Sequence, residues 1–164
     1  MTGEQVRALL EERARVLARP VERRAVSGTF EAVSFVLADE RYAVESRFVV
    51  EVFPLADLAL LPGAKAPVLG VTAWRGGLLT VLDLRPLLGI STTALNDLGR
   101  VIVMGEARAA FGILVDRVQE IVSLRLSEIH EPPDGVAVRR DYLRGVTGGA
   151  LLVLDAGALL RLGG

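Results

Sequence analysis

The stretch at residues 70–90, GVTAWRGGLLTVLDLRPLLGI, decides how the chain folds. The glycines at 76 and 77 predict a hairpin turn, because glycine reaches the positive φ angles that tight turns need. Residues 78–82 form an apolar run that one threonine interrupts, which is typical of a buried strand. Asp83 follows where the N-cap of a short helix would lie. The stretch therefore predicts two strands, a tight turn and a helix, with Arg75 as a lone charge at the hairpin tip.

The same pattern returns near the end of the chain. Residues 145–162, GVTGGALLVLDAGALLRL, repeat the Gly-Val-Thr triplet, the glycine pair, the apolar strand and the Leu-Asp step, so a second short helix is expected after the strand at 150–154. Upstream, residues 49–52 have a counterpart in residues 118–121. A repeated unit of this size buries its apolar face against a neighbour, so we expect two similar lobes that pack together.

Composition limits the classes of function. The chain has 164 residues, 51% of them apolar, which favours a folded chain of one domain or two small ones. A net charge of −1 gives no general attraction to nucleic acid or to an anionic membrane. Cysteine is absent, so disulfides and thiolate metal sites are excluded. Charge-free stretches fall short of the ~18 residues that span a bilayer, and a signal peptide is not evident, so we expect a soluble, cytoplasmic protein.

Residues 1–24 are expected to form an amphipathic helix and a connector. Thr2 and Gln5 fit a capping box, and Pro20 ends the helical pattern. The apolar residues of one face are Val6, Leu9, Leu10, Val16 and Leu17. Two interpretations stay open, because such a helix either packs on its own domain or docks on a partner.

From Thr29 onward the periodicity changes to two, which predicts many short strands. We expect residues 25–164 to form one domain, with a first lobe at about 28–90, a linker at 91–99 and a second lobe at about 100–164. Residues 130–135, HEPPDG, are expected to form an exposed loop, since prolines cannot continue a strand ladder. Short strands with frequent turn signals are typical of small barrels or sandwiches.

Side chains that could carry catalysis are few. His130 is the only histidine, and a solvated loop histidine is preferred over a general base. Asp83 and Asp155 could form a carboxylate pair, but each precedes a leucine-rich turn, as a helix cap does. The glycine pairs lack the Gly-Lys-Ser/Thr ending of a phosphate-binding loop. We therefore predict no catalytic residue, no metal site and no cofactor.

A partner-binding surface remains. Arg75 beside Trp74 is the kind of pair that anchors interfaces. Glu51 lies on a short strand whose other members are Val49, Val50 and Val52. Either both faces of this strand are buried, or one face is left for a partner. Since an unpaired charge among apolar neighbours is costly, we expect Glu51 and Arg75 to pair across the first lobe.

At these residues the sequence resembles the CheW family, the coupling proteins of bacterial chemotaxis. The resemblance extends over roughly 29–162, with ordered motifs at 42–44, 49–52, 70–76, 81–85, 112–116 and 152–155. It implies a mainly β, CheW-like fold in which two SH3-like, five-stranded β-barrels pack across an apolar seam. The N-terminal helix is additional to the minimal family domain.

The resemblance also implies a non-catalytic adaptor. Its partners would be the regulatory domain of a CheA-type histidine kinase and the cytoplasmic tips of chemoreceptors, with no nucleic acid and no direct membrane insertion. The arginine of the family's Asn-x-Arg-Gly motif falls on Arg75, and the family's strand glutamate falls on Glu51. The predicted partner-binding residues are therefore Arg75, Trp74, Glu51, Val49, Val50 and Val52.

One position departs from the family pattern. Ala73 stands where the family has asparagine, and Trp74 fills the variable slot that follows. Losing the amide changes how the loop around Arg75 is held. An alternative function is therefore a CheW-like module that binds the kinase without receptors, as a sequestering or regulatory protein, in a gliding or pilus motility system.

Overall fold

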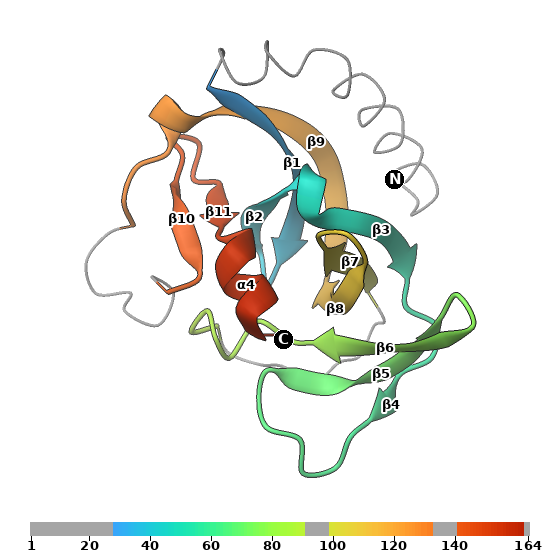
Figure 1. Ribbon diagram of the computed structural model, residues 1–164. Helices are drawn as coiled ribbons and strands as arrows, with labels where there is room; N and C mark the ends of the chain where they lie inside the picture. The colour runs from blue at the N-terminus through green and yellow to red at the C-terminus, as the bar shows by residue number, and fades with distance from the viewer. Residues whose placement is uncertain (1–27, 91–98, 133–140, 163–164) are drawn as a thin grey trace.

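The computed structural model describes residues 28–90, 99–132 and 141–162 (Figure 1). The predicted N-terminal helix, most of the predicted linker and the end of the predicted 130–135 loop lie outside these residues. Within them the chain is mainly β, with eleven strands and one α-helix. In chain order the elements are β1 (Thr29–Leu37), β2 (Glu40–Glu45), η1 (Ser46–Phe48), β3 (Val49–Pro54), β4 (Ala59–Leu60), β5 (Val68–Trp74), β6 (Gly77–Leu82), β7 (Arg100–Gly105), β8 (Ala109–Val115), β9 (Arg117–Arg125), η2 (Leu126–Glu128), β10 (Leu143–Val146), β11 (Leu152–Leu154) and α4 (Ala156–Leu162).

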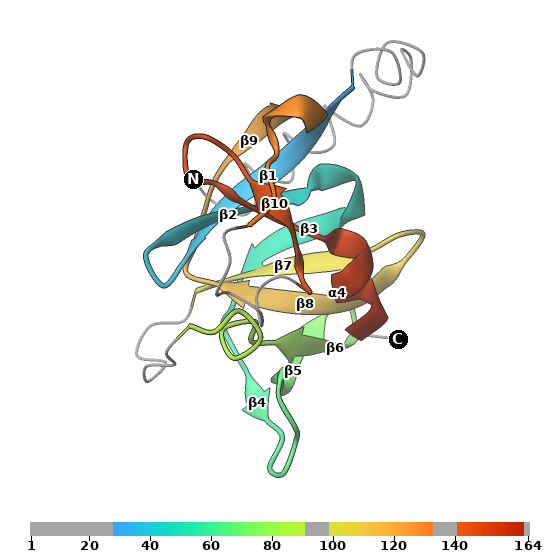
Figure 2. The same ribbon diagram turned by 90° about the vertical axis from the view of Figure 1, so that its left-hand side faces the viewer.

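The strands form two sheets, which lie one above the other in Figure 2. Sheet A has five strands in the order β10-β11-β2-β1-β9, and sheet B has six in the order β3-β7-β8-β6-β5-β4. Most neighbours are antiparallel, but β11 runs parallel to β2, and β6 runs parallel to β8. These results confirm a mainly β chain with two sheets, although sheet B has one strand more than expected.

The sequence repeat is also a repeat of structure, with an exchange of strands. Sheet A joins β1 and β2 to β9, β10 and β11, whereas sheet B joins β7 and β8 to β3, β4, β5 and β6. If β1, β2, β3, β5 and β6 are matched to β7, β8, β9, β10 and β11, both sheets have the same strand order. Each sheet therefore draws strands from both halves of the chain, and neither corresponds to one continuous range.

The apolar core follows the same plan. The largest cluster contains residues of both sheets and of α4, among them Phe35, Tyr42, Ile102, Phe111 and Leu159. A second cluster consists of residues of sheet A and of the turn between β10 and β11: Phe30, Ala32, Ala43, Leu124, Leu151 and Val153. A third, the sheet-B cluster, comprises Leu55, Leu79, Val81, Val101, Val103 and Leu114. Each sheet is thus apolar on both faces: one face packs on the largest cluster, here called the shared cluster, and the other on the cluster that belongs to that sheet.

The prediction of a helix after the strand at 78–82 is wrong, whereas the helix predicted after 150–154 is confirmed as α4. Residues 85–89 form turns instead of a helix, and Gly89 ends them with a φ of +70°. Asp83 is therefore not a helix cap but begins these turns, since its Oδ1 accepts a hydrogen bond from the backbone N–H of Arg85, two residues on, at 3.1 Å. At the second site Asp155 Oδ1 accepts from the N–H of Ala158 at 3.1 Å and caps α4.

The hairpin between β5 and β6 turns one residue earlier than predicted. Trp74 pairs with Gly77, so the two turn residues are Arg75 and Gly76, with φ angles of +46° and +78°. Two positive φ angles define the type I′ turn that suits the twist of a two-residue hairpin. An arginine in the left-handed region costs about 1 kcal/mol relative to the ordinary helical region. The turn therefore imposes this backbone conformation on Arg75, and contacts of the side chain must offset its cost.

His130 is not simply a loop residue. Its backbone N–H donates to the carbonyl of Val146 at 2.9 Å, and its backbone carbonyl accepts a hydrogen bond from the Val146 N–H at 2.8 Å. The segment that follows β9 is therefore bridged to β10, at the other edge of sheet A. The sequence pattern missed this backbone bridge because the two prolines begin only after this residue, whereas His130 is exposed, as expected.

A buried ion pair follows β6. The guanidinium of Arg85 donates to both carboxylate oxygens of Asp83, from Nε at 3.0 Å and from Nη2 at 2.9 Å, and each residue is 8% exposed. These hydrogen bonds raise the pKa of Arg85 above its ordinary value, against the opposing effect of its burial. We expect Arg85→Met or Asp83→Asn to lower the free energy of unfolding by about 3 kcal/mol, because either change leaves a buried charge unpaired.

Urea denaturation measures this loss, and Arg47→Ala is the control. Arg47 also forms an ion pair, with Glu45 at 3.0 Å, but its side chain is 62% exposed. Its loss should cost less than about 1 kcal/mol. Equal costs for Arg85→Met and Arg47→Ala would contradict a structural role for the buried pair.

Candidate partner-binding site

Three of the predicted residues meet at one end of sheet B. Glu51 lies on β3, at one edge of the sheet, whereas Trp74 ends β5 and Arg75 lies in the turn that follows. Strands β7, β8 and β6 separate β3 from β5 in the sheet order. In a flat sheet this spacing would be roughly 19 Å, far beyond the reach of two side chains. Sheet B must therefore be strongly curled to bring these residues together.

The three side chains form one hydrogen-bonded cluster, the Glu51–Trp74–Arg75 cluster. Arg75 Nη2 donates to Glu51 Oε1 at 2.5 Å, which confirms the expected ion pair. Trp74 Nε1 donates to Glu51 Oε2 at 3.2 Å. The Arg75 guanidinium also lies over the Trp74 ring, with Cζ 4.7 Å from a ring centroid, as in a cation–π pair. Both oxygens of Glu51 thus have a donor, and Arg75 is held on two sides.

Exposure differs sharply within the cluster. Glu51 is 8% exposed, and Trp74 is half-buried and packs against the sheet-B cluster. By contrast, the Arg75 side chain is 56% exposed. The arrangement therefore presents a fixed cation to solvent from a buried base, which suits recognition of a partner rather than chemistry on a substrate.

The three valines beside Glu51 contact the core on both faces of β3. Val52 is buried in the shared cluster, and Val49 packs against that cluster. Val50 packs instead on the sheet-B cluster. The structure favours the first interpretation, a strand packed on both faces, but Val49 and Val50 are only half-buried and leave some apolar surface beside Glu51.

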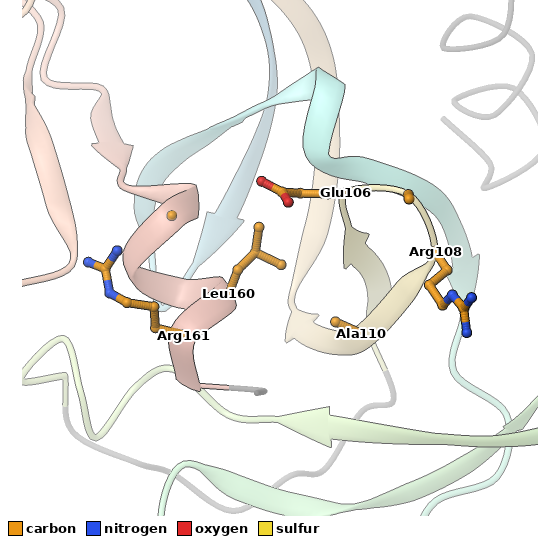
Figure 3. A pocket seen from close by; sticks show the side chains of 7 residues that line it. Glu106, Arg108, Ala110, Leu160 and Arg161 are labelled. Carbon is orange, nitrogen blue, oxygen red and sulfur yellow. The ribbon is translucent and has the colours of Figure 1, made fainter.

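A separate groove lies between α4 and the turn that joins β7 to β8 (Figure 3). Its volume is about 480 Å³, and its lining residues are Glu106, Ala107, Arg108, Ala110, Gly157, Leu160 and Arg161. Glu106, Arg108 and Arg161 are exposed, and the two arginines extend away from each other. Sequence reasoning did not single out these residues. The groove holds no buried acid, base or nucleophile, so it gives no support to catalysis.

The described residues also bear on other functions. No cluster of histidine, aspartate and glutamate suited to a metal ion occurs at 28–90, 99–132 or 141–162. Over the same ranges, no helix is both long and apolar enough to span a bilayer.

Sequence reasoning missed the ion pair between Asp83 and Arg85, although two opposite charges in the apolar run LDLRPLL were a signal for it.

We expect Glu51 and Arg75 to be energetically coupled. Glu51→Ala and Arg75→Ala each remove the same ion pair, so the double variant should lose less stability than the two single losses combined. For residues in direct contact the coupling is about 1 kcal/mol or more. Urea denaturation of the four proteins in this cycle measures it, and strictly additive losses would contradict the pairing.

Comparisons with known proteins agree with this picture. A family model described as CheW-like domain matches residues 31–163. The chemotaxis protein CheW of Treponema pallidum is 24% identical over 134 residues, which cover 77% of this chain and 79% of that protein. The CheW protein of Rhizobium meliloti is 30% identical over 122 residues, which cover 73% and 78% of the two chains. Protein FrzA of Myxococcus xanthus is 30% identical over 112 residues, covering 68% and 70%.

A solved structure supports the fold. The crystal structure of the scaffolding protein TtCheW from Thermoanaerobacter tengcongensis matches with a TM-score of 0.66 and 22% identity, covering 77% of this chain and 88% of that one. The family model covers most of the chain, and the two relatives of 30% identity are covered over more than two thirds of their length. The chain therefore belongs to the CheW family and is a non-catalytic adaptor of chemotaxis or motility signal transduction.

Proposed function

We propose that the Glu51–Trp74–Arg75 cluster, with the exposed parts of Val49 and Val50, binds the regulatory domain of a CheA-type histidine kinase and couples it to chemoreceptor tips. The observation that supports this most is the exposure of Arg75 above a buried Glu51. Holding the cation in advance reduces the side-chain entropy lost on binding. A partner that offers a carboxylate and an aliphatic surface would complement this site. Through receptor binding the protein would associate with membrane-bound receptor arrays.

The proposal includes the finer architecture. We take the two sheets as the counterparts of two SH3-like lobes. In support, each sheet is linked from edge to edge by a short segment of chain. His130, which follows β9, bridges to β10 in sheet A, and β4, which follows β3, pairs with β5 in sheet B. Val52 would help to fix the strand that carries Glu51, since it is buried in the shared cluster.

Co-sedimentation with receptor-containing membranes, with and without the kinase, tests the proposal. The wild-type protein should pellet with receptors and increase the amount of kinase that pellets. Arg75→Glu should reduce its apparent affinity at least about tenfold, because it places a second carboxylate beside Glu51 and repels an acidic partner. Arg75→Gly, which suits the left-handed backbone, removes the charge without this repulsion and should also weaken binding.

Arg117→Glu is the matched control. Arg117 is an exposed arginine at the start of β9 in sheet A, so the change in charge is the same. Its pelleting should equal that of the wild type. Kinase binding without recruitment by receptors would instead indicate the sequestering function, and binding to neither would contradict the proposal.

A further inference from the structure

Trp74 fills the variable position of the family's Asn-x-Arg-Gly motif, so the family resemblance does not explain its role. Residue 73 is alanine here, so its side chain cannot donate a hydrogen bond to the loop. Ala73 is also exposed and pairs with Leu78, a residue that is 77% exposed. The loop that carries Arg75 must therefore be held by something other than residue 73.

Trp74 contacts every part of the cluster. Its indole N–H bonds Glu51, its ring lies under the Arg75 guanidinium, and its apolar surface packs on the sheet-B cluster. The residue directly across the hairpin is Gly77, which has no side chain to compete for the ring. One side chain thus links β3, the turn and the core of sheet B.

We propose that Trp74 is a positioning residue that fixes the Arg75 guanidinium for the partner. This inference rests on the proposed function of Arg75. The turn fixes the backbone of Arg75 at a φ of +46°, but the long side chain beyond it can still rotate. The Glu51 carboxylate holds one nitrogen, and the Trp74 ring restricts the plane of the guanidinium. Trp74 thereby acts on binding through Arg75 and not through a contact of its own.

The chain has a single tryptophan, so its fluorescence reports on this cluster alone. Glu51→Ala removes the acceptor of the indole N–H, and Arg75→Gly removes the covering guanidinium. We expect each variant to increase acrylamide quenching of the emission about twofold, because both changes expose the ring, whereas Arg117→Glu should leave quenching unchanged. Unchanged quenching in Glu51→Ala and Arg75→Gly would overturn the contacts of Trp74 with these two residues. This test needs no binding partner.

Binding to the kinase regulatory domain tests the positioning role. Trp74→Leu removes both the N–H and the ring, and should weaken binding by about tenfold. Trp74→Phe keeps an aromatic ring under the guanidinium and loses only the N–H, so its loss should be smaller. Urea denaturation confirms that both variants are folded at the temperature of the assay.

The decisive comparison is made in an Arg75→Gly background. If Trp74 acts through Arg75, adding Trp74→Leu should cause no further loss of affinity. A further loss as large as that in the wild-type background would show that the indole contacts the partner directly, and would overturn the proposal. Wild-type protein that fails to bind the kinase would refute the proposed function, whereas the quenching result would still decide whether Trp74 holds Arg75.

Discussion

The carboxylate of Glu51 is buried at the edge of a curled sheet, and a buried charge must be paired where it lies. The donors come from the β5–β6 hairpin, which the flat order of strands would place roughly 19 Å away. The curl of sheet B, the early position of the turn and the positive φ of Arg75 are all consistent with this one requirement. The cost of a strained arginine is offset by an ion pair and an aromatic contact.

The exchange of strands explains why the two sheets depend on each other. The β1–β2 pair is separated in sequence from the strands that complete its sheet, and the same holds for β7 and β8. The shared cluster then packs the faces that both sheets turn inward, and Asp116 ties the junction of the sheets through bonds with Val36 and Ala38. Residues from both halves of the chain therefore pack in one core, and β8 and β9 lie on either side of this junction.

Local patterns predicted much of this structure. The repeat, the helix after the strand at 150–154 and the pairing of Glu51 with Arg75 followed from residue types and spacing. The turn at Arg75 was misplaced because two adjacent glycines outweighed a non-glycine residue that tertiary contacts hold at positive φ. The helix predicted after β6 does not form; Asp83 there makes an Asx turn with the N–H of Arg85 and an ion pair with its guanidinium. The strand exchange could not be predicted, since pairing between distant strands leaves no trace in local periodicity.

The repeat also shows which features belong to the fold and which to recognition. The position of Glu51 corresponds to Glu120 in the second repeat, where the side chain is exposed and the backbone is tied to Ser34 instead. The turn that corresponds to Trp74 and Arg75 contains Thr147, two glycines and Ala150. The second repeat therefore forms the same architecture with an exposed glutamate at this position and without an indole or a guanidinium in the corresponding turn. Their presence in sheet B alone is not required by the fold, and this asymmetry favours a role in binding.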